Sequence, residues 1–223
     1  INRIIRKNDS DGEIFDMNSF LTISNLIYLI VEEHGQGRNS RVYKTRDPQL
    51  LCDVVAVKRF HLSDDQKRKK QETAFYKKVK KLAGLKGVNL LQIIDFTIQS
   101  EYAYVVMSWL DGDKLPDYID KQKSSLTVRQ IIKMIINLAE NLKAYHNYDP
   151  SLIHGDIKPE NIIVDNKGTP QLADVFIEWE LSGINPEIAE HPGFKAPESI
   201  FGRQTIASDI YSRYKRLKGF NVL

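Results

Sequence analysis

One polar loop between two apolar segments constrains this chain more than any other stretch of its sequence. It lies within residues 152–174, where strand-like apolar residues precede and follow charged and amide side chains. Asp156, Lys158 and Asn161 stand at short fixed steps, and Asp174 follows thirteen residues after Asn161. A carboxylate can accept a proton from a hydroxyl, an ammonium can neutralise a phosphoryl group, and an amide oxygen and a second carboxylate can share Mg²⁺. The loop therefore predicts a site for phosphate chemistry, against the plainer interpretation of a polar loop between buried strands.

The order of residues in this loop is similar to a family signature. The segment His154–Asn161 resembles the catalytic loop of protein kinases, H-R-D-x-x-x-x-N, with Gly155 where the family has arginine. Asp174 resembles the metal-binding aspartate of the family's D-F-G element. The resemblance implies an α+β fold of two lobes, the first an antiparallel sheet with one helix and the second mostly helical.

The resemblance also implies roles for the loop residues. Asp156 would act as the base or orient the nucleophile, Lys158 would stabilise the phosphate, and His154 would pack rather than exchange protons. Asn161 and Asp174 would hold Mg²⁺, with ATP as the phosphate donor. A lysine two residues after the aspartate resembles serine/threonine kinases rather than tyrosine kinases, so the implied partner is a protein substrate.

A glycine-rich stretch follows an apolar, β-branched segment over residues 27–33, which is typical of a strand. Gly35, Gly37, Ser40 and Val42 form the pattern G-x-G-x-x-S-x-V. Glycines let a hairpin backbone lie close over phosphates where a Cβ would obstruct. The pattern alone is weak because glycine-rich hairpins are common. Ser40 replaces the family's third glycine, a small residue for a small one.

Residues 54–58, Val-Val-Ala-Val-Lys, resemble the family's V-A-I-K strand. Strand alternation places Ala56 and Lys58 on one face. The resemblance implies that this face looks at the nucleotide and that Lys58 holds the α- and β-phosphates. An isolated strand lysine would instead be an ordinary solvated side chain.

A charged helix is expected after the capping box at residues 63–66, ending near Leu82. Glu72 is the only acid inside it, which makes Glu72 the candidate ion-pair partner of Lys58. The alternative is a solvated glutamate among lysines. The lysines themselves are interpreted as a solvated face rather than a nucleic-acid patch.

Two strands are expected over residues 90–98 and 102–107, and the stretch after them resembles the kinase hinge. By that resemblance Met107 would be the gatekeeper and backbone groups would hold adenine at Ser108, Trp109 and Leu110, with Ile163 completing the nucleotide site. Met107 and Trp109 suit ordinary packing equally well. The expected division is an extension over 1–26, a first lobe over 27–108 and a second lobe over 109–223.

The second lobe combines family-like features with departures from the family. A capping box at Thr127–Gln130 and a broad apolar stripe predict a deeply packed helix that leads to the loop. Gly155 replaces an arginine that contacts a phosphorylated activation loop in many kinases, and Ser182 is the only hydroxyl residue between Asp174 and Glu198. Activity is therefore not expected to depend on such phosphorylation. Phe176 stands where D-F-G has glycine and cannot copy its backbone freedom.

The resemblance covers residues 27–212, where Ser208–Ser212 resembles the start of the family's central hydrophobic helix. A basic segment follows instead of an apolar one, and the chain begins with Ile1 rather than methionine. We expect a fragment whose second lobe is incomplete. A partner chain is one way to cover the apolar surface that this leaves.

Composition excludes several other classes of protein. The 223 residues carry a net charge of +3, too mild to argue for nucleic-acid binding. Cys52 is the only cysteine, so no disulfide framework exists and a reducing, cytoplasmic location is expected. No apolar run approaches about 18 residues, so no membrane span is expected.

Three functions remain open. The first is an ATP- and Mg²⁺-dependent serine/threonine protein kinase. The second is a small-molecule phosphotransferase, because His154-Gly155-Asp156 resembles the H-G-D start shared by aminoglycoside and choline kinases. The third is a pseudokinase that binds nucleotide or a partner without turnover, which Phe176 and the incomplete second lobe favour.

Overall fold

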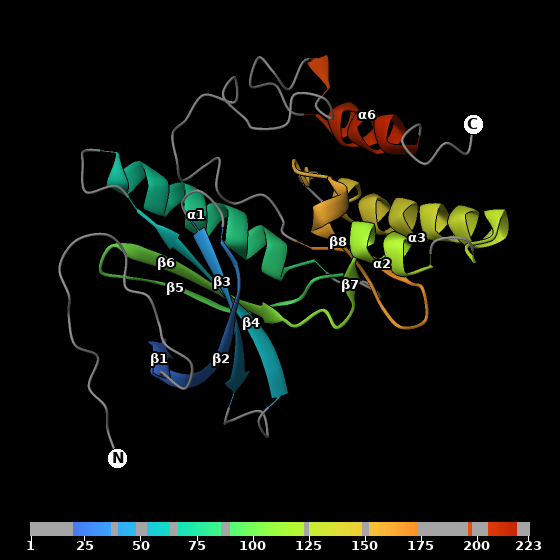
Figure 1. Cartoon of the computed structure of the whole chain (residues 1–223). Coiled ribbons are helices and arrows are strands. Elements are labelled where there is room, and N and C mark those ends of the chain that lie inside the picture. Colours follow the sequence, from blue (N-terminus) through green and yellow to red (C-terminus); the bar gives the residue numbers. More distant parts are fainter. Residues whose placement is uncertain are drawn as a thin grey trace. The chain divides into compact units, whose positions relative to one another are not determined.

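Two compact units make up the described part of the chain (Figure 1). The computed structural model describes residues 20–36, 40–47, 53–62, 67–85, 90–122, 125–148, 152–173, 196–197 and 205–217. Among these, the first unit contains the residues up to Val79 and Ile93–Trp109, and the second contains Lys80–Gln92 and the residues from Leu110 onward.

The first unit is built on a six-stranded sheet in which every neighbouring pair is antiparallel. The strand order is β1-β2-β3-β4-β6-β5, with the bounds β1 Phe20–Ile23, β2 Leu26–Gln36, β3 Ser40–Asp47, β4 Asp53–His61, β5 Ile93–Gln99 and β6 Tyr102–Ser108. Ser24 and Asn25 join β1 to β2 with φ values of 48° and 70°. Positive φ at both turn positions gives the twist that a tight hairpin requires.

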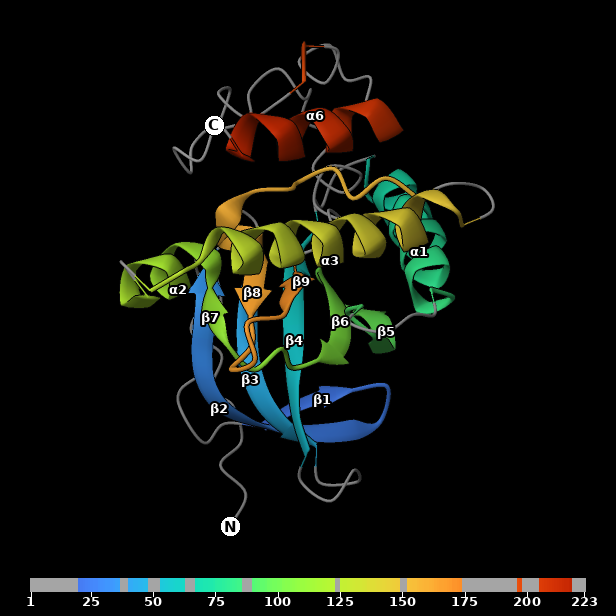
Figure 2. The ribbon, with the colours of Figure 1, turned by 90° about the vertical axis from the view of Figure 1, so that its right-hand side faces the viewer.

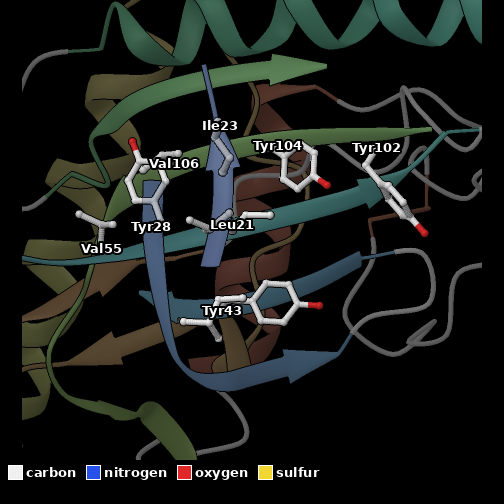
Figure 3. Packing of buried hydrophobic residues seen from close by; sticks show 10 residues of the cluster. Leu21, Ile23, Tyr28, Tyr43, Val55, Tyr102, Tyr104 and Val106 are labelled. Atoms are coloured by element: carbon white, nitrogen blue, oxygen red, sulfur yellow. The ribbon is translucent and has the colours of Figure 1, made fainter. Parts of the chain in front are cut away.

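One face of this sheet carries a core rich in tyrosine (Figure 3). Tyr28, Tyr43, Tyr102 and Tyr104 pack there with aliphatic residues of β1, β2, β4 and β6. Leu21 and Ile23 of β1 are buried in this core. Residues 20–23 were expected to belong to an extension before the first lobe. They instead pair with β2, and Leu21 and Ile23 contribute to the interior of the first unit.

Replacing Tyr28 with phenylalanine is expected to reduce the loss of stability in alkali. The Tyr28 ring is fully buried, and its hydroxyl has no hydrogen-bond partner in the part of the chain that the structure describes. Burial, with the charges of Asp47 and Asp95, raises the pKa of Tyr28 to about 12. Because an unfolded tyrosine titrates near pH 10, the stability due to this proton is complete below about pH 10 and is lost as pH rises through about 12.

The measurement is urea unfolding at pH 8 and pH 11. The parental chain is expected to lose about 1 kcal/mol more between these pH values than Tyr28→Phe does. The exposed Tyr76 supplies the matched control, Tyr76→Phe, which should follow the parental chain. Equal losses for Tyr28→Phe and the parental chain would contradict the assignment.

The charged helix of the first half is present as α1, Arg68–Ala83. Its buried face consists of Gln71, Phe75, Val79 and Leu82, at helical spacing. Phe75 meets Phe60 of β4 edge to face with ring centroids 6.4 Å apart. The capping box expected at residues 63–66 lies outside the described residues.

The second unit combines a small sheet with helices (Figure 2). Its three strands, in the order β7-β8-β9, are β7 Asp113–Lys114, β8 Ile162–Val164 and β9 Pro170–Leu172. The helices described there are α2 Leu115–Gln122, α3 Val128–His146, the 3₁₀ turn η1 Pro159–Asn161, and α6 Ile206–Leu217. Helix α3 packs against β9, and α2 packs against η1 and β8.

Helix α3 begins with the expected capping box and differs from expectation along its length. Thr127 Oγ1 accepts from the Gln130 backbone N–H at 3.3 Å, and Gln130 Oε1 accepts from the Thr127 N–H at 2.8 Å. The prediction that this helix is deeply packed is wrong for one side, since three apolar side chains at steps of four are exposed by half or more: Val128 60%, Ile132 51% and Ile136 50%. The apolar stripe is wider than the face that the described residues cover, which is centred on Met134, Leu142 and Tyr145.

Close backbone packing fixes the start of the small sheet. A Cβ added to Gly112 would lie 2.3 Å from the Val164 carbonyl oxygen, so only glycine fits before β7. None of the described helices is long and apolar enough to span a membrane. The α+β architecture, an antiparallel sheet with one helix in the first unit and mainly helices in the second, agrees with the expected fold class.

Candidate active site

The residues predicted to act on a nucleotide fall into two groups, one in each unit. The first unit holds Gly35, Ser40, Val42, Ala56, Lys58, Glu72, Met107, Ser108 and Trp109, and the second holds Leu110, Asp156, Lys158, Asn161 and Ile163. Gly37 and Asp174 lie outside the described residues.

Three adjacent strands of the first unit place the predicted nucleotide residues side by side. The register pairs Val42 of β3 with Lys58 of β4, and Ala56 of β4 with Met107 of β6. Residues directly opposite in an antiparallel ladder share a face, so these four side chains lie on the face opposite the tyrosine core. Lys58 is 5% exposed, and its Nζ lies 5.2 Å from the centre of the Phe60 ring. A buried lysine among apolar neighbours is suited to hold an anion.

The glycine hairpin begins where β2 departs from regular pairing. Gly35 pairs with Val42, and a register shift lies between Glu33 and Gly35. A Cβ built on Gly35 would meet no heavy atom within 4 Å, counting the described residues. Nothing in that part of the chain therefore requires glycine at this position, in contrast to Gly112.

Glu72 lies in the first turns of α1 with a partner of its own. Its Oε1 accepts from Arg68 Nε at 2.9 Å, one helical turn away, and Arg68 also donates to the Ser100 carbonyl. Both side chains of the pair are about one-third exposed. The pairing of Glu72 with Lys58 stays a prediction.

The polar loop of the second unit gathers around one carboxylate. Asp156 Oδ2 lies 2.8 Å from Lys158 Nζ and accepts from Asn161 Nδ2 at 2.7 Å. Asn161 Nδ2 also donates to the Asp156 carbonyl at 2.9 Å. Both amide hydrogens of Asn161 are thus engaged by Asp156, which leaves its Oδ1 as an acceptor.

Asn161 is fixed in place by its surroundings. It is buried and ends η1, where its N–H donates to the Lys158 carbonyl at 2.8 Å. Its own carbonyl accepts from Ala173 N–H at 2.8 Å, which ties the loop to the segment just before Asp174. Ile163 follows in β8, half-buried and paired with Lys114 and Gln171.

Asp209 accepts hydrogen bonds from the backbone of this loop, although the sequence analysis did not identify Asp209 as functional. Asp209 of α6 is 2% exposed. Its Oδ2 accepts from the His154 N–H at 2.9 Å, and its Oδ1 accepts from the Gly155 N–H at 3.0 Å. Gly155 has φ +83°, a left-handed conformation that glycine adopts without strain. The bend at Gly155 turns both N–H groups toward one carboxylate. The backbone conformation therefore explains why glycine stands at this position.

Asp209 also binds the end of α3. Its Oδ2 lies 3.0 Å from His146 Nε2, and the two side chains are 3% and 12% exposed. His146 is therefore a largely buried partner of Asp209. The sequence could have drawn attention to Asp209 because this acid lies near Ile206 and Ile210 in an amphipathic segment. That pattern does not indicate which residues Asp209 contacts.

The side chain of His154, at the start of the loop, packs against Tyr145 of α3. His154 is fully buried, and its ring meets the Tyr145 ring edge to face at 5.7 Å. Its Nδ1 accepts weakly from the Asp156 N–H at 3.4 Å. Burial, and to a smaller extent the charge of Asp209, raises the pKa of Tyr145. The packing role expected for His154 agrees with this environment.

The donor set suits magnesium only in part. The Asn161 Oδ1 and the Asp156 carboxylate are hard oxygen donors, which Mg²⁺ prefers over nitrogen or sulfur. The described residues contain no group of three or more His, Cys, Asp or Glu able to hold a metal. A magnesium site at this loop would therefore draw on Asn161 and, as the sequence predicts, Asp174.

Known proteins resemble this chain over most of its length. A sequence model of the family described as "Protein kinase domain" matches residues 28–213. A probable serine/threonine-protein kinase of Clostridium perfringens is 32% identical over 191 residues, which covers 83% of this chain and 27% of that protein. The probable serine/threonine-protein kinase PknB of Lactococcus lactis is 29% identical over 195 residues, covering 83% and 30%. Serine/threonine-protein kinase unc-51 of Caenorhabditis elegans is 28% identical over 191 residues, covering 80% and 22%. The chain spans less than a third of the length of these relatives.

Proposed function

Because the chain belongs to the protein kinase family, we propose that it transfers the γ-phosphoryl group of Mg·ATP to serine and threonine hydroxyls of protein substrates. The observation that carries the proposal is the cluster around the Asp156 carboxylate, which Lys158 and Asn161 contact at 2.8 and 2.7 Å. A carboxylate, an ammonium and an amide oxygen within one short loop are the groups that phosphoryl transfer to a hydroxyl requires.

The first unit supplies the nucleotide residues of this proposal. Val42, Ala56 and Met107 offer an apolar surface for the base, and Lys58 on the same face pairs with the phosphates. Backbone groups of Ser108, Trp109 and Leu110 hold the adenine edge, and Ile163 of the second unit packs against the base. The glycine hairpin, with Gly35, Gly37 and Ser40, covers the phosphates. No described residue requires glycine at position 35, and a phosphate bound close to the backbone is the reason we propose for it.

The second unit supplies the groups for transfer. Asp156 orients the incoming hydroxyl and accepts its proton, with the carboxylate held by Asn161 through Oδ2. Lys158 neutralises charge that develops on the transferred group. Asn161 Oδ1 and Asp174 hold magnesium, which when bound offsets the negative charge of the phosphates. The Ser/Thr preference follows from Lys158, and the three relatives described above are named as serine/threonine kinases.

The transfer experiment uses γ-labelled ATP, Mg²⁺ and a mixed protein acceptor such as casein with myelin basic protein. We expect label on phosphoserine and phosphothreonine after acid hydrolysis. Lys58→Met and Glu72→Gln test the predicted ion pair, and a loss with Lys58→Met but not with Glu72→Gln would remove Glu72 from the site. Nucleotide binding without transfer would favour a pseudokinase, and label on an aminoglycoside or choline rather than on protein would favour a small-molecule phosphotransferase.

Replacing Asp174 with alanine is expected to weaken Mg·ATP binding by about tenfold or more, since one of two charged or polar magnesium ligands is lost. Isothermal titration with a non-hydrolysable ATP analogue measures the affinity with magnesium and with EDTA. The variant should lose most of the magnesium-dependent part of the affinity. An affinity equal to that of the parental chain in magnesium would remove Asp174 from the site.

A partner chain over the exposed side of α3 is also proposed. The exposed Val128, Ile132 and Ile136 form an apolar strip that a partner with a matching apolar face would cover. The chain alone is then expected to bind the dye ANS, and Ile132→Lys with Ile136→Lys should reduce the signal at least about twofold, in proportion to the apolar area removed. Val54→Lys, at an exposed apolar residue of the first unit, is the control. No dye binding by the parental chain would mean that the strip is already covered.

The proposed location is the cytoplasm. A single cysteine in 223 residues gives the chain no disulfide of its own, as is usual in reducing compartments. Cell fractionation followed by detection of the native protein tests this location, and recovery in an oxidising compartment would contradict it.

A further inference from the structure

Strand β2, which leads into the glycine hairpin, contains a β-bulge at His34. In the pairing of β2 with β3, Glu33 lies opposite Tyr43 and Gly35 lies opposite Val42, so His34 has no opposite residue. Such a bulge bends a strand and re-aims the side chain of the extra residue. The imidazole of His34 meets the indole of Trp109 edge to face, with ring centroids 4.7 Å apart and planes at 81°.

A second strand of the hairpin reaches the same indole. Lys44 of β3 places its Nζ 4.7 Å from the centre of the Trp109 ring, within the range of a cation–π interaction. Trp109 therefore has one neighbour from each strand of the hairpin, although it follows β6 at the other side of β4 in the sheet order.

Glu32 connects the two neighbours of the indole. Its Oε1 lies 3.7 Å from Lys44 Nζ and 3.9 Å from His34 Nδ1. Glu32 and Lys44 are directly opposite in the ladder, so the register itself brings this pair together. The four side chains Glu32, His34, Lys44 and Trp109 form a contiguous cluster, which we call the indole clamp.

We propose that the indole clamp fastens the base of the glycine hairpin to the segment after β6 and so positions the hairpin over the nucleotide. Trp109, His34 and Lys44 act as positioning residues, and the role of the hairpin toward nucleotide rests on the proposed function. The ladder ties the two strands of the hairpin to each other and, through β4, to β6. The contacts of His34 and Lys44 with Trp109 join both strands of the hairpin directly to the strand end where adenine is expected. Loss of the clamp lets the hairpin open locally while the sheet stays folded.

The first test measures the hairpin without any nucleotide. Hydrogen–deuterium exchange of peptides covering residues 33–43 should become about three- to tenfold faster in Trp109→Ala, as expected for the loss of a cation–π and an aromatic contact. Trp109→Phe keeps an aromatic ring and should exchange nearly as slowly as the parental chain. Exchange in the buried strand β6 should be unchanged in both variants, which separates local opening from global loss of stability.

A double-mutant cycle shows whether the contacts act as one unit. Lys44→Gln should speed exchange of the hairpin, and adding it to Trp109→Ala should change little, because the indole that Lys44 contacts is already gone. The matched control is Arg41→Gln, which breaks the pair of Arg41 Nη1 with Glu33 Oε1 at 3.0 Å in the same hairpin without touching Trp109. The fold-change in hairpin exchange caused by Arg41→Gln should multiply with the fold-change caused by Trp109→Ala, as expected for two independent contacts.

The second test measures transfer kinetics with His34→Ala and Lys44→Gln. Both variants should raise KM for ATP about three- to tenfold with kcat changed less than twofold, because the hairpin positions the nucleotide. Lys44→Arg keeps the cation and should restore KM. Hairpin exchange that is unchanged in Trp109→Ala, or effects of Lys44→Gln and Trp109→Ala that multiply, would overturn the clamp. A parental chain without transfer or nucleotide binding would overturn the proposed function, and the exchange measurement would still decide the clamp.

Discussion

Asp156→Ala is expected to lower kcat for phosphoryl transfer by about 10²- to 10⁴-fold, the usual contribution of a positioned general base. Asp156 belongs to the second unit, whereas the residues proposed to hold the base and the α- and β-phosphates belong mainly to the first. The dissociation constant for ATP should therefore change by less than about threefold. Steady-state transfer of label at saturating ATP measures kcat, and calorimetric titration measures the dissociation constant for ATP.

The control removes a different carboxylate from the same unit. Asp120 is exposed near the end of α2, so Asp120→Ala should transfer phosphate at the parental rate. Asp156→Asn keeps the shape of the side chain and removes its ability to accept a proton, and it should be nearly as slow as Asp156→Ala. If Asp156→Ala transferred phosphate at the parental rate, the role given to this residue would be wrong.

Asp209→Ala is expected to lower the free energy of unfolding by roughly 3–5 kcal/mol, because it leaves buried partners without their acceptor. The N–H groups of His154 and Gly155 and the ring of His146 all bind this one carboxylate, at 2.9, 3.0 and 3.0 Å. The loop that carries Asp156 would lose this support, so kcat for the proposed transfer should fall as well. Urea unfolding monitored by circular dichroism gives the stability, and the labelled transfer assay gives kcat.

Two further variants separate the parts of this network. Asp113→Ala breaks an exposed ion pair with Lys121 at 2.6 Å in the same unit and should cost no more than about 1 kcal/mol. His146→Gln removes only one of the contacts of Asp209, and it should cost less than Asp209→Ala and leave kcat closer to the parental value. A cost for Asp209→Ala as small as that of Asp113→Ala would show that the loop does not depend on Asp209.

Local patterns allowed much of this molecule to be predicted from its sequence. The cluster of Asp156, Lys158 and Asn161 was predictable because the loop resembles the catalytic loop of protein kinases, which implies that these residues act together. Strand alternation placed Ala56 and Lys58 on one face, and the ladder of β3, β4 and β6 adds Val42 and Met107 to that face. The capping box of α3 was predictable because its two members are three residues apart.

Features that depend on distant contacts could not be predicted. His146 and Asp209 are 63 residues apart, and no periodic pattern links them. The bulge at His34 follows from how β2 pairs with β3, so no sequence pattern indicated that this ring contacts Trp109. The apolar stripe of α3 indicated an amphipathic helix but did not indicate which part of the stripe is covered, and Ile132 and Ile136 are exposed. Each of these cases required knowledge of which elements pack together.

The proposal that residues of both units act on one triphosphate is tested most directly by a crystal structure with magnesium and a non-hydrolysable ATP analogue. We expect Lys58 Nζ within hydrogen-bond distance of the α- or β-phosphate, and magnesium bound by Asn161 Oδ1 and Asp174. We also expect the terminal phosphate to face the Asp156 carboxylate. A nucleotide bound elsewhere, or Lys58 and Asp174 on opposite sides of the molecule with no shared cleft, would contradict the proposal.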